Sequence, residues 1–376
     1  MPTGDLALVI SAALAAALLI FFLLHSRRKS HKRQQLLEVE LDNLNPEAEK
    51  QREIERLRTR ISAVLQAQGG SQNTTAAPVR FSASIVHLRF GERAAAAHGL
   101  LELLNADDPA AVQRGVAEGF DAIEREVMAN GTDVDKECFD YVVRRAAGSS
   151  DKLFPNSPYP RDCDANGVRA DRLTTLGEGM LLADFRSHPH AVAARLTLVH
   201  VLVLRLYSTA AFASINQPLR MASDKDRASA AAAHPFPVLV MLLAEAIKKL
   251  RAVPARVVHG AGEETSTVEL WRGLRDAAVP DEFITTGGTE NAPMSTTRSL
   301  EVAMRYSASA MPMLMRLNVG TFMQLGADLS FVSAFPDEDE VLYPPLTYLE
   351  SMSPPAEVKV GEGVTFTIVD VKPFIS

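Results

Sequence analysis

The stretch FPDEDEVLYPP, from Phe335 to Pro345, is the most informative part of this chain. Four consecutive acidic residues lead into a short apolar run that is typical of a strand and that ends at two prolines. Side chains two positions apart on a strand face the same side. Glu338 and Glu340 are therefore predicted to converge on one site, where their like charges are costly unless a cation arrives. The alternative is a solvated acidic loop, which is the usual interpretation of such a charge run.

Two further strand-like segments come before this stretch. Val268 to Leu274 (VELWRGL) contains Arg272, and Met294 to Thr297 (MSTT) contains Ser295. Both belong to a C-terminal third in which short β-rich runs alternate with turn residues. These runs are Arg256 to His259, Thr267 to Arg272, Met313 to Val319, Glu340 to Tyr343 and Phe366 to Val371. From about 81 to 252, apolar residues recur at helical spacing instead. Helices followed by strands predict an α+β fold.

In order, these three segments resemble the Arg–Ser–Glu signature of mono-ADP-ribosyltransferases. The segment Ile215 to Arg220 is similar to the helix before the first strand in that family. The resemblance covers about residues 171–376 and implies a catalytic domain there, a split β-sandwich with an NAD cleft that follows a helical region at 81–170. One departure is the absence of an aromatic residue shortly before the serine, where residues 292–294 read Ala-Pro-Met.

The resemblance implies that NAD is a substrate, without a metal or a bound redox cofactor. The NAD-binding residues that it implies are Arg272, Gly273, Ser295, Thr296 and Glu340. A planar guanidinium at Arg272 suits phosphate or ribose oxygens. Gly273 allows a close backbone approach to the nicotinamide amide. Ser295 buttresses the site, although it could instead form a turn or cap a helix at 300–306. Glu340 is the catalytic carboxylate, which stabilises an oxocarbenium-like cation.

The acceptor side of the reaction depends on Glu338. A second glutamate at this position marks the arginine-specific branch of the family and implies transfer of ADP-ribose to an arginine of a protein, with release of nicotinamide. Phe331 and Phe335 lie where the family presents an aromatic ring to the acceptor, so Phe335 is assigned to acceptor binding with Glu338. Two alternatives stay open, an NAD glycohydrolase on the same fold and a catalytically inactive, membrane-tethered module that binds NAD or a partner.

The N-terminal segment has the composition of a membrane anchor. Leu6 to Leu24 is apolar apart from Ser11, and it is long enough to span a bilayer at about 1.5 Å per residue. Five basic residues follow within positions 27–33. The positive-inside rule then places the rest of the chain in the cytosol. We interpret residues 1–33 as a transmembrane anchor, and the alternative is a cleaved signal peptide with unusual flanks.

Between the anchor and the catalytic region we expect a helical stalk at 34–68 and a linker at 69–80. Ile54, Leu57, Ile61 and Val64 follow the spacing of a coiled coil, but Pro46 limits the pattern to about two heptads. Two heptads are marginal for a coiled coil, so we favour a simple stalk, and a weak dimer through the stalk is the alternative. The linker is rich in small and polar residues.

Composition excludes other classes of function. The chain has 376 residues and a formal net charge of −7, which gives no indication of nucleic-acid binding. Its two cysteines, Cys138 and Cys163, argue against a disulfide framework and a Cys-rich zinc site. Gly260-Ala-Gly262 lacks the third glycine of a dinucleotide-binding turn. His188 and His190 have no further ligands nearby in sequence, so an ordinary loop is favoured over a metal site.

Overall fold

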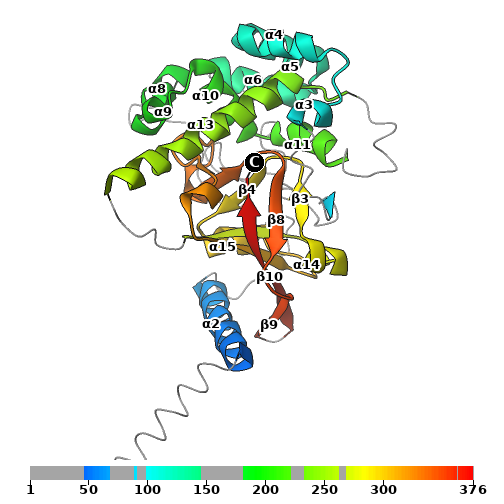
Figure 1. Cartoon of the computed structure of the whole chain (residues 1–376), viewed down its shortest axis with the longest axis vertical. Helices are drawn as coiled ribbons and strands as arrows, with labels where there is room; N and C mark the ends of the chain where they lie inside the picture. The colour runs from blue at the N-terminus through cyan, green and yellow to red at the C-terminus, as the bar shows by residue number, and fades with distance from the viewer. Residues whose placement is uncertain are drawn as a thin grey trace, which may run out of the picture. The chain divides into compact units, whose positions relative to one another are not determined.

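The computed structural model describes seven ranges of the chain (Figure 1), residues 46–67, 89–90, 99–144, 181–221, 233–261, 268–361 and 363–375. By internal contacts the chain divides into two compact units, residues 1–60 and 61–376. Helix α2 (Pro46–Ala67) lies within the stalk predicted at 34–68. It begins at a proline, a residue that is favoured at the first helical position. The predicted anchor at Leu6 to Leu24 and the linker at 69–80 lie outside the described residues.

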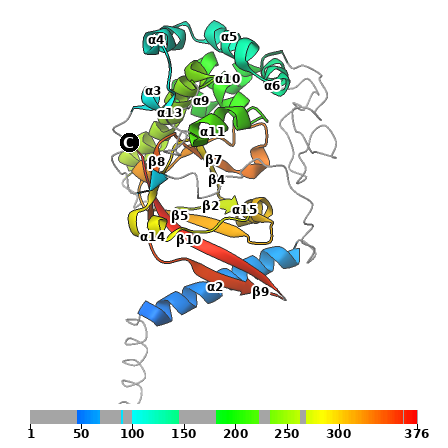
Figure 2. The ribbon, with the colours of Figure 1, turned by 90° about the vertical axis from the view of Figure 1, so that its right-hand side faces the viewer.

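The helices between residues 100 and 261 share one apolar core. They are α3 (Leu100–Leu103), α4 (Pro109–Glu118), α5 (Phe120–Asn130), α6 (Asp133–Arg144), α8 (Leu182–Ser187), α9 (Pro189–Ala193), α10 (Leu198–Tyr207), α11 (Phe212–Met221) and α13 (Pro237–Ala261). Helices α10 and α13 pack against each other, and α4, α5 and α6 each pack against one of them. Figure 2 shows these helices gathered on one side of the strands. The boundary predicted near residue 170 therefore does not separate two cores.

Helix α10 lies inside this core. The sequence predicts a buried core helix between Ala191 and Leu206, and every residue of α10 from His200 to Tyr207 is buried. Thr197 caps its N-terminus, because the side-chain oxygen accepts a hydrogen bond from the backbone of His200. In the described ranges no single helix is long and apolar enough to span a membrane, although α10 and α11 together, bent by 79°, meet that criterion.

Ten strands form one hydrogen-bonded sheet in the described part of the chain. Their order is β1 (Arg89–Phe90), β3 (Gly288–Glu290), β8 (Thr347–Ser351), β10 (Val364–Phe374), β5 (Met313–Val319), β2 (Val268–Leu274), β4 (Met294–Thr297), β7 (Glu340–Tyr343) and β6 (Ala327–Asp328), with β9 (Ala356–Val360) also on β10. Strands β10 and β5 are parallel, and the other pairs are antiparallel. Helix α15 (Leu300–Ser307) packs on β2, and α14 (Asp281–Thr286) packs on β8.

The junction between β2 and β4 divides the sheet. These two strands are in register only where Trp271 lies opposite Thr297, whereas β2 and β5 are in register along the whole of β2. The strands on the β2 side and those on the β4 side therefore diverge away from this one pair. The α+β fold expected from the sequence is confirmed, and the split sandwich stays a prediction.

The predicted strands after residue 267 are confirmed, but the prediction for Arg256 to His259 is wrong. Those residues belong to helix α13, which continues to Ala261. Their β-branched pair, Val257 and Val258, costs only a few tenths of a kcal/mol per residue in a helix. A helix that is already several turns long gains one hydrogen bond for each residue added, so it extends through such a pair.

Candidate active site

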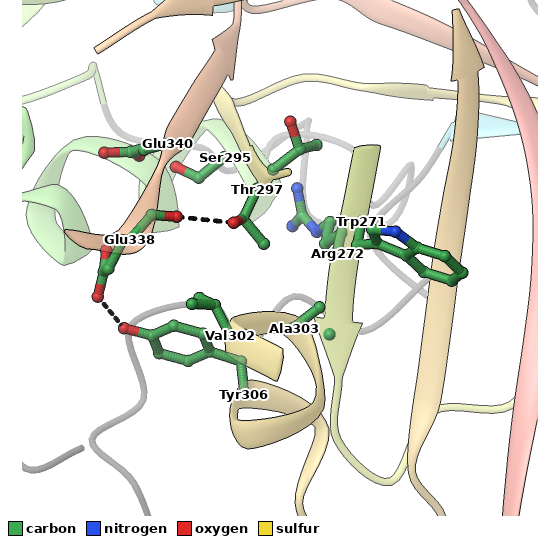
Figure 3. A pocket seen from close by; sticks show the side chains of 11 residues that line it. Trp271, Arg272, Ser295, Thr297, Val302, Ala303, Tyr306, Glu338 and Glu340 are labelled. Atoms are coloured by element: carbon green, nitrogen blue, oxygen red, sulfur yellow. Dashed lines mark hydrogen bonds between the residues drawn. The ribbon is translucent and has the colours of Figure 1, made fainter. Parts of the chain in front are cut away.

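A cavity with about 270 Å³ of empty space lies where the two groups of strands diverge. Strands β2 and β4, helix α15 and the chain before β7 surround it (Figure 3). The residues that line it are Trp271, Arg272, Gly273, Ser295, Thr296, Thr297, Val302, Ala303, Tyr306, Glu338 and Glu340. The structure thus brings together all of the predicted NAD-binding residues and Glu338, from three separate segments.

Arg272 is held by a buried ion-pair network that the sequence did not indicate. Its Nη2 lies 3.4 Å from Oε2 of Glu290, and the other oxygen of Glu290 lies 3.3 Å from Nε of Arg220 on α11. Burial lowers the pKa of Arg272 to about 10; Glu290 opposes this shift and Arg220 adds to it. The second terminal nitrogen of Arg272, Nη1, is buried without a hydrogen-bond partner among the described residues. One carboxylate thus faces two guanidinium groups, and one buried donor remains for a ligand.

Gly273 is required by the packing of helix α15. A Cβ atom at this position would lie 2.0 Å from the backbone oxygen of Ala303 and 2.8 Å from the backbone nitrogen of Ser307. No real side chain tolerates such distances to backbone atoms. The glycine therefore lets α15 lie directly against β2, where the helix forms one wall of the cavity.

Ser295 lies in a buried polar network beneath the cavity. The Tyr207 hydroxyl donates to the backbone oxygen of Pro293 at 3.2 Å and lies 3.5 Å from Oγ of Ser295, while Asn216 donates to Tyr207 at 3.1 Å. Burial raises the pKa of Tyr207, so the phenol stays protonated and able to donate. The alternative role of Ser295 as a helix cap is wrong, because Ser299 caps α15. The network links α10 and α11 to β4.

Thr296 and Thr297 join β4 to the acidic stretch. Thr296 donates its hydroxyl to the backbone oxygen of Val341, and Thr297 donates to that of Glu338, both at 2.7 Å. Each bond connects a β4 side chain to the backbone of the neighbouring segment. The two threonines therefore fix how the segment with both glutamates passes the cavity.

The two glutamates converge on the cavity by a different geometry from the one predicted. Glu338 ends a short 3₁₀ helix, η4 (Pro336–Glu338), and Asp339 adopts a left-handed conformation with φ of 47°. Strand β7 begins only at Glu340, so the two residues are not i and i+2 of one strand. A proline at the start of η4 favours helical backbone, and the left-handed residue turns the chain before the strand. Glu338 and Glu340 are 2% and 4% exposed, so the alternative of a solvated acidic loop is wrong for both.

The assignment of Phe335 to acceptor binding is not supported by its position. Its side chain is 0% exposed and belongs to the apolar core beneath the loop, where no acceptor can reach it. Phe331 is only partly buried, and its ring stacks on His188 with centroids 4.7 Å apart. The sequence pattern placed two aromatic residues before the glutamates, but it could not show which ring fills the core.

His188 and Gly260, from the two other motifs, both lie at helix ends. In the described ranges no group of three His, Cys, Asp or Glu side chains is arranged to hold a metal ion. His188 and His190 instead contact each other edge to face, at a centroid distance of 5.2 Å. Gly260 and Ala261 lie at the end of helix α13, so no strand leads into the glycine pair as a dinucleotide-binding turn would require.

Comparisons with known proteins found similarity at the level of structure. No protein-family model matches the chain, and no curated protein matches its sequence. The structure is similar to that of the ADP-ribosyltransferase HopU1 of Pseudomonas syringae pv. Tomato DC3000, with 18% identity, coverage of 54% of this chain and 93% of that one, and a TM-score of 0.36. It is also similar to exoenzyme S of Pseudomonas aeruginosa, with 20% identity, coverage of 50% and 86%, and a TM-score of 0.32. A third similar structure is the ADP-ribosyltransferase Vis toxin of Vibrio splendidus, with 15% identity, coverage of 52% and 83%, and a TM-score of 0.34.

Proposed function

We propose that this protein binds NAD in the cavity and transfers its ADP-ribose to an arginine side chain of a protein, releasing nicotinamide. The observation that carries the proposal is the convergence of Arg272, Ser295, Glu338 and Glu340 on one cavity. A guanidinium, a serine hydroxyl and two carboxylates line this cavity, and these groups suit the nicotinamide ribose end of NAD.

The residues present fit the demands of breaking the bond between nicotinamide and ribose. As this bond breaks, its electron pair leaves with nicotinamide and the ribose acquires oxocarbenium character. The carboxylate of Glu340 faces the cavity and supplies negative charge beside that cation. The unpartnered Nη1 of Arg272 is a buried donor for a phosphate or ribose oxygen. Ser295 and its hydrogen-bonded neighbours keep the floor of the cavity fixed.

The second step joins the acceptor nitrogen to the ribose carbon. An arginine guanidinium stays protonated in water, so the nitrogen must be oriented and must lose one proton as the new bond forms. Glu338 supplies a second carboxylate at the cavity, where it pairs with the acceptor guanidinium. The balance of the reaction is NAD plus arginine giving ADP-ribosyl-arginine, nicotinamide and one proton.

The test is incubation of the full chain with labelled NAD and agmatine, a small guanidino acceptor. ADP-ribosyl-agmatine from the wild type, lost in both Glu340→Ala and Glu338→Gln, supports transfer to arginine. Free ADP-ribose and nicotinamide without an adduct would favour the glycohydrolase. If the chain neither binds NAD nor releases nicotinamide, the inactive binding module is the better description.

We propose in addition that Leu6 to Leu24 anchors the protein in a membrane, with the catalytic unit in the cytosol. The support is the length of the apolar run and the basic residues that follow it. Protease treatment of sealed vesicles tests the orientation, because the unit from 61 to 376 should be digested only when it faces the outside medium. A weak dimer through the stalk would appear as a concentration-dependent mass of the detergent-solubilised chain.

A further inference from the structure

Tyr306 and Glu338 both line the cavity and contact each other directly. The tyrosine hydroxyl on α15 donates a short hydrogen bond to Oε1 of Glu338, which comes from the turn before β7 (Figure 3). Both side chains are almost fully buried, and both line the cavity. A hydrogen bond to a charged group in such surroundings is stronger than one in water.

The backbone around Glu338 is fixed from the opposite side. Thr297 donates to its backbone oxygen at 2.7 Å, and Arg298 pairs with the carboxylate of Asp339 at 2.7 Å. These contacts set where the chain passes, but they do not set the direction of a flexible glutamate side chain. Glu338 also lies in a 3₁₀ turn, so the alternation of a strand does not orient it either.

Tyr306 itself is well placed to orient another group. The backbone of its helix lies against Gly273, and the backbone oxygen of Tyr306 accepts a hydrogen bond from Nε of Arg275 at 3.1 Å. A tyrosine ring has two side-chain torsions and is rigid beyond them. The hydroxyl at its end is therefore a donor at a nearly constant position in the cavity.

We propose that Tyr306 is a positioning residue, whose hydroxyl fixes the carboxylate of Glu338 in the orientation that receives the acceptor guanidinium. This inference rests on the proposed function. A carboxylate has about four lone-pair sites on two oxygens, so one bond from a hydroxyl to Oε1 does not use up its capacity to accept hydrogen bonds from a guanidinium. Tyr306 acts through Glu338, and so it affects the transfer step rather than the cleavage of NAD.

The test compares Tyr306→Phe with the wild type in the full chain, using agmatine and NAD. The variant keeps the ring and removes only the hydroxyl. We expect kcat/KM for transfer to agmatine to fall about 10- to 100-fold, the range for one hydrogen bond to a charged group, with a raised KM for agmatine. NAD hydrolysis in the absence of agmatine and the KM for NAD should stay within about twofold of the wild type. Tyr348→Phe is the matched control, because Tyr348 donates its hydroxyl to Thr286 outside the cavity, and that variant should leave both activities unchanged.

Three results would overturn the inference. Unchanged transfer in Tyr306→Phe would show that the hydroxyl has no role. An equal loss of transfer and hydrolysis would assign Tyr306 to the cavity as a whole and not to Glu338. If the wild type hydrolyses NAD but forms no adduct, the proposed transfer to arginine fails, and the role of Tyr306 fails with it. The first two results leave the proposed function intact, so the failures are distinguishable.

Discussion

At the scale of single residues, Glu290 is the most consequential side chain that the sequence pattern did not indicate. It lies between Arg272 and Arg220 with 2% of its surface exposed, and it compensates the charge of two buried guanidinium groups. A carboxylate in this position is expected to keep Arg272 aligned before NAD arrives. Sequence could not reveal it, because the partners are 18 and 70 residues away along the chain.

We predict that Glu290→Gln destabilises the protein by about 3–5 kcal/mol, because two buried cations lose their counter-charge. Addition of NAD should restore more stability to this variant than to the wild type, since the pyrophosphate then supplies negative charge. Thermal unfolding with and without NAD measures both effects. Glu350→Gln, at an exposed position on β8, is the control, and the prediction fails if the two variants unfold at the same temperature.

A second prediction at this scale concerns Gly273. Gly273→Ala places a methyl group 2.0 Å from the backbone oxygen of Ala303, so α15 must move away from β2. We expect a loss of stability of about 1–3 kcal/mol, as for other overpacked cores. Transfer to agmatine should also fall, because α15 carries Tyr306 into the cavity. Gly99→Ala serves as the control, since a Cβ there meets no atom within 4 Å, and equal melting temperatures for the two variants would refute the argument.

At the scale of elements, the entry into helix α13 contains a buried histidine that titrates. Phe236 donates its backbone N–H to Nδ1 of His234 at 2.9 Å, and Nε2 lies 3.0 Å from the backbone oxygen of Ile215. Nδ1 thus accepts and Nε2 donates, which is the pattern of a neutral ring. Burial lowers the pKa of His234 to about 4, although the contact with Ile215 opposes this shift.

This histidine makes stability depend on pH in a defined direction. Because the pKa is about 4 in the folded protein and 6.5 as a reference, the unfolded chain binds more protons between these values. The contribution of His234 is complete above pH 6.5 and is lost as the pH falls toward 4, by about 3 kcal/mol in total. In His234→Asn, the unfolding midpoint should depend less on pH across this window than in the wild type. In His190→Asn, at an exposed position, the pH dependence should stay as in the wild type. Parallel curves for His234→Asn and the wild type would contradict the assignment.

Some elements could be predicted from the sequence, and others could not. Strands β2, β5 and β7 could be predicted because they are short, rich in β-branched and apolar residues, and bounded by turns. The prediction for 256–259 was wrong because a two-residue β-branched pair does not stop a long helix. The convergence of Glu338 and Glu340 on one site could be predicted, but the backbone geometry that produces it could not. A 3₁₀ turn and a left-handed Asp339 are found where the sequence predicted a continuous strand. The family resemblance thus named residues that line one cavity, but it could not show the contacts between them.

At the scale of the whole molecule, the helical core extends across the boundary near residue 170 that the sequence suggested. Helices α4, α5 and α6 pack against α10 and α13, and residues 61–376 form one compact unit.

We predict that a fragment of residues 61–376 unfolds cooperatively. A fragment of residues 171–376 should instead aggregate or unfold without a clear transition, because it exposes the apolar faces of α10 and α13. Size-exclusion chromatography and thermal unfolding test this prediction. A 171–376 fragment that is monomeric and unfolds cooperatively would contradict it and would support a domain boundary near residue 170.

The place of strand β10 has a consequence for how the protein is made. Strands β5 and β8 are neighbours only through β10, which inserts between them and is synthesised after both. A ribosome adds residues from the N-terminus at about 5–20 per second, so β5 and β8 stay unjoined until Val364 to Phe374 has emerged. Every residue of the proposed site has been translated by then, yet the sheet that supports β2 is incomplete. A nascent chain halted before Val364 should therefore carry every side chain of the proposed site but lack the complete sheet that holds them in place.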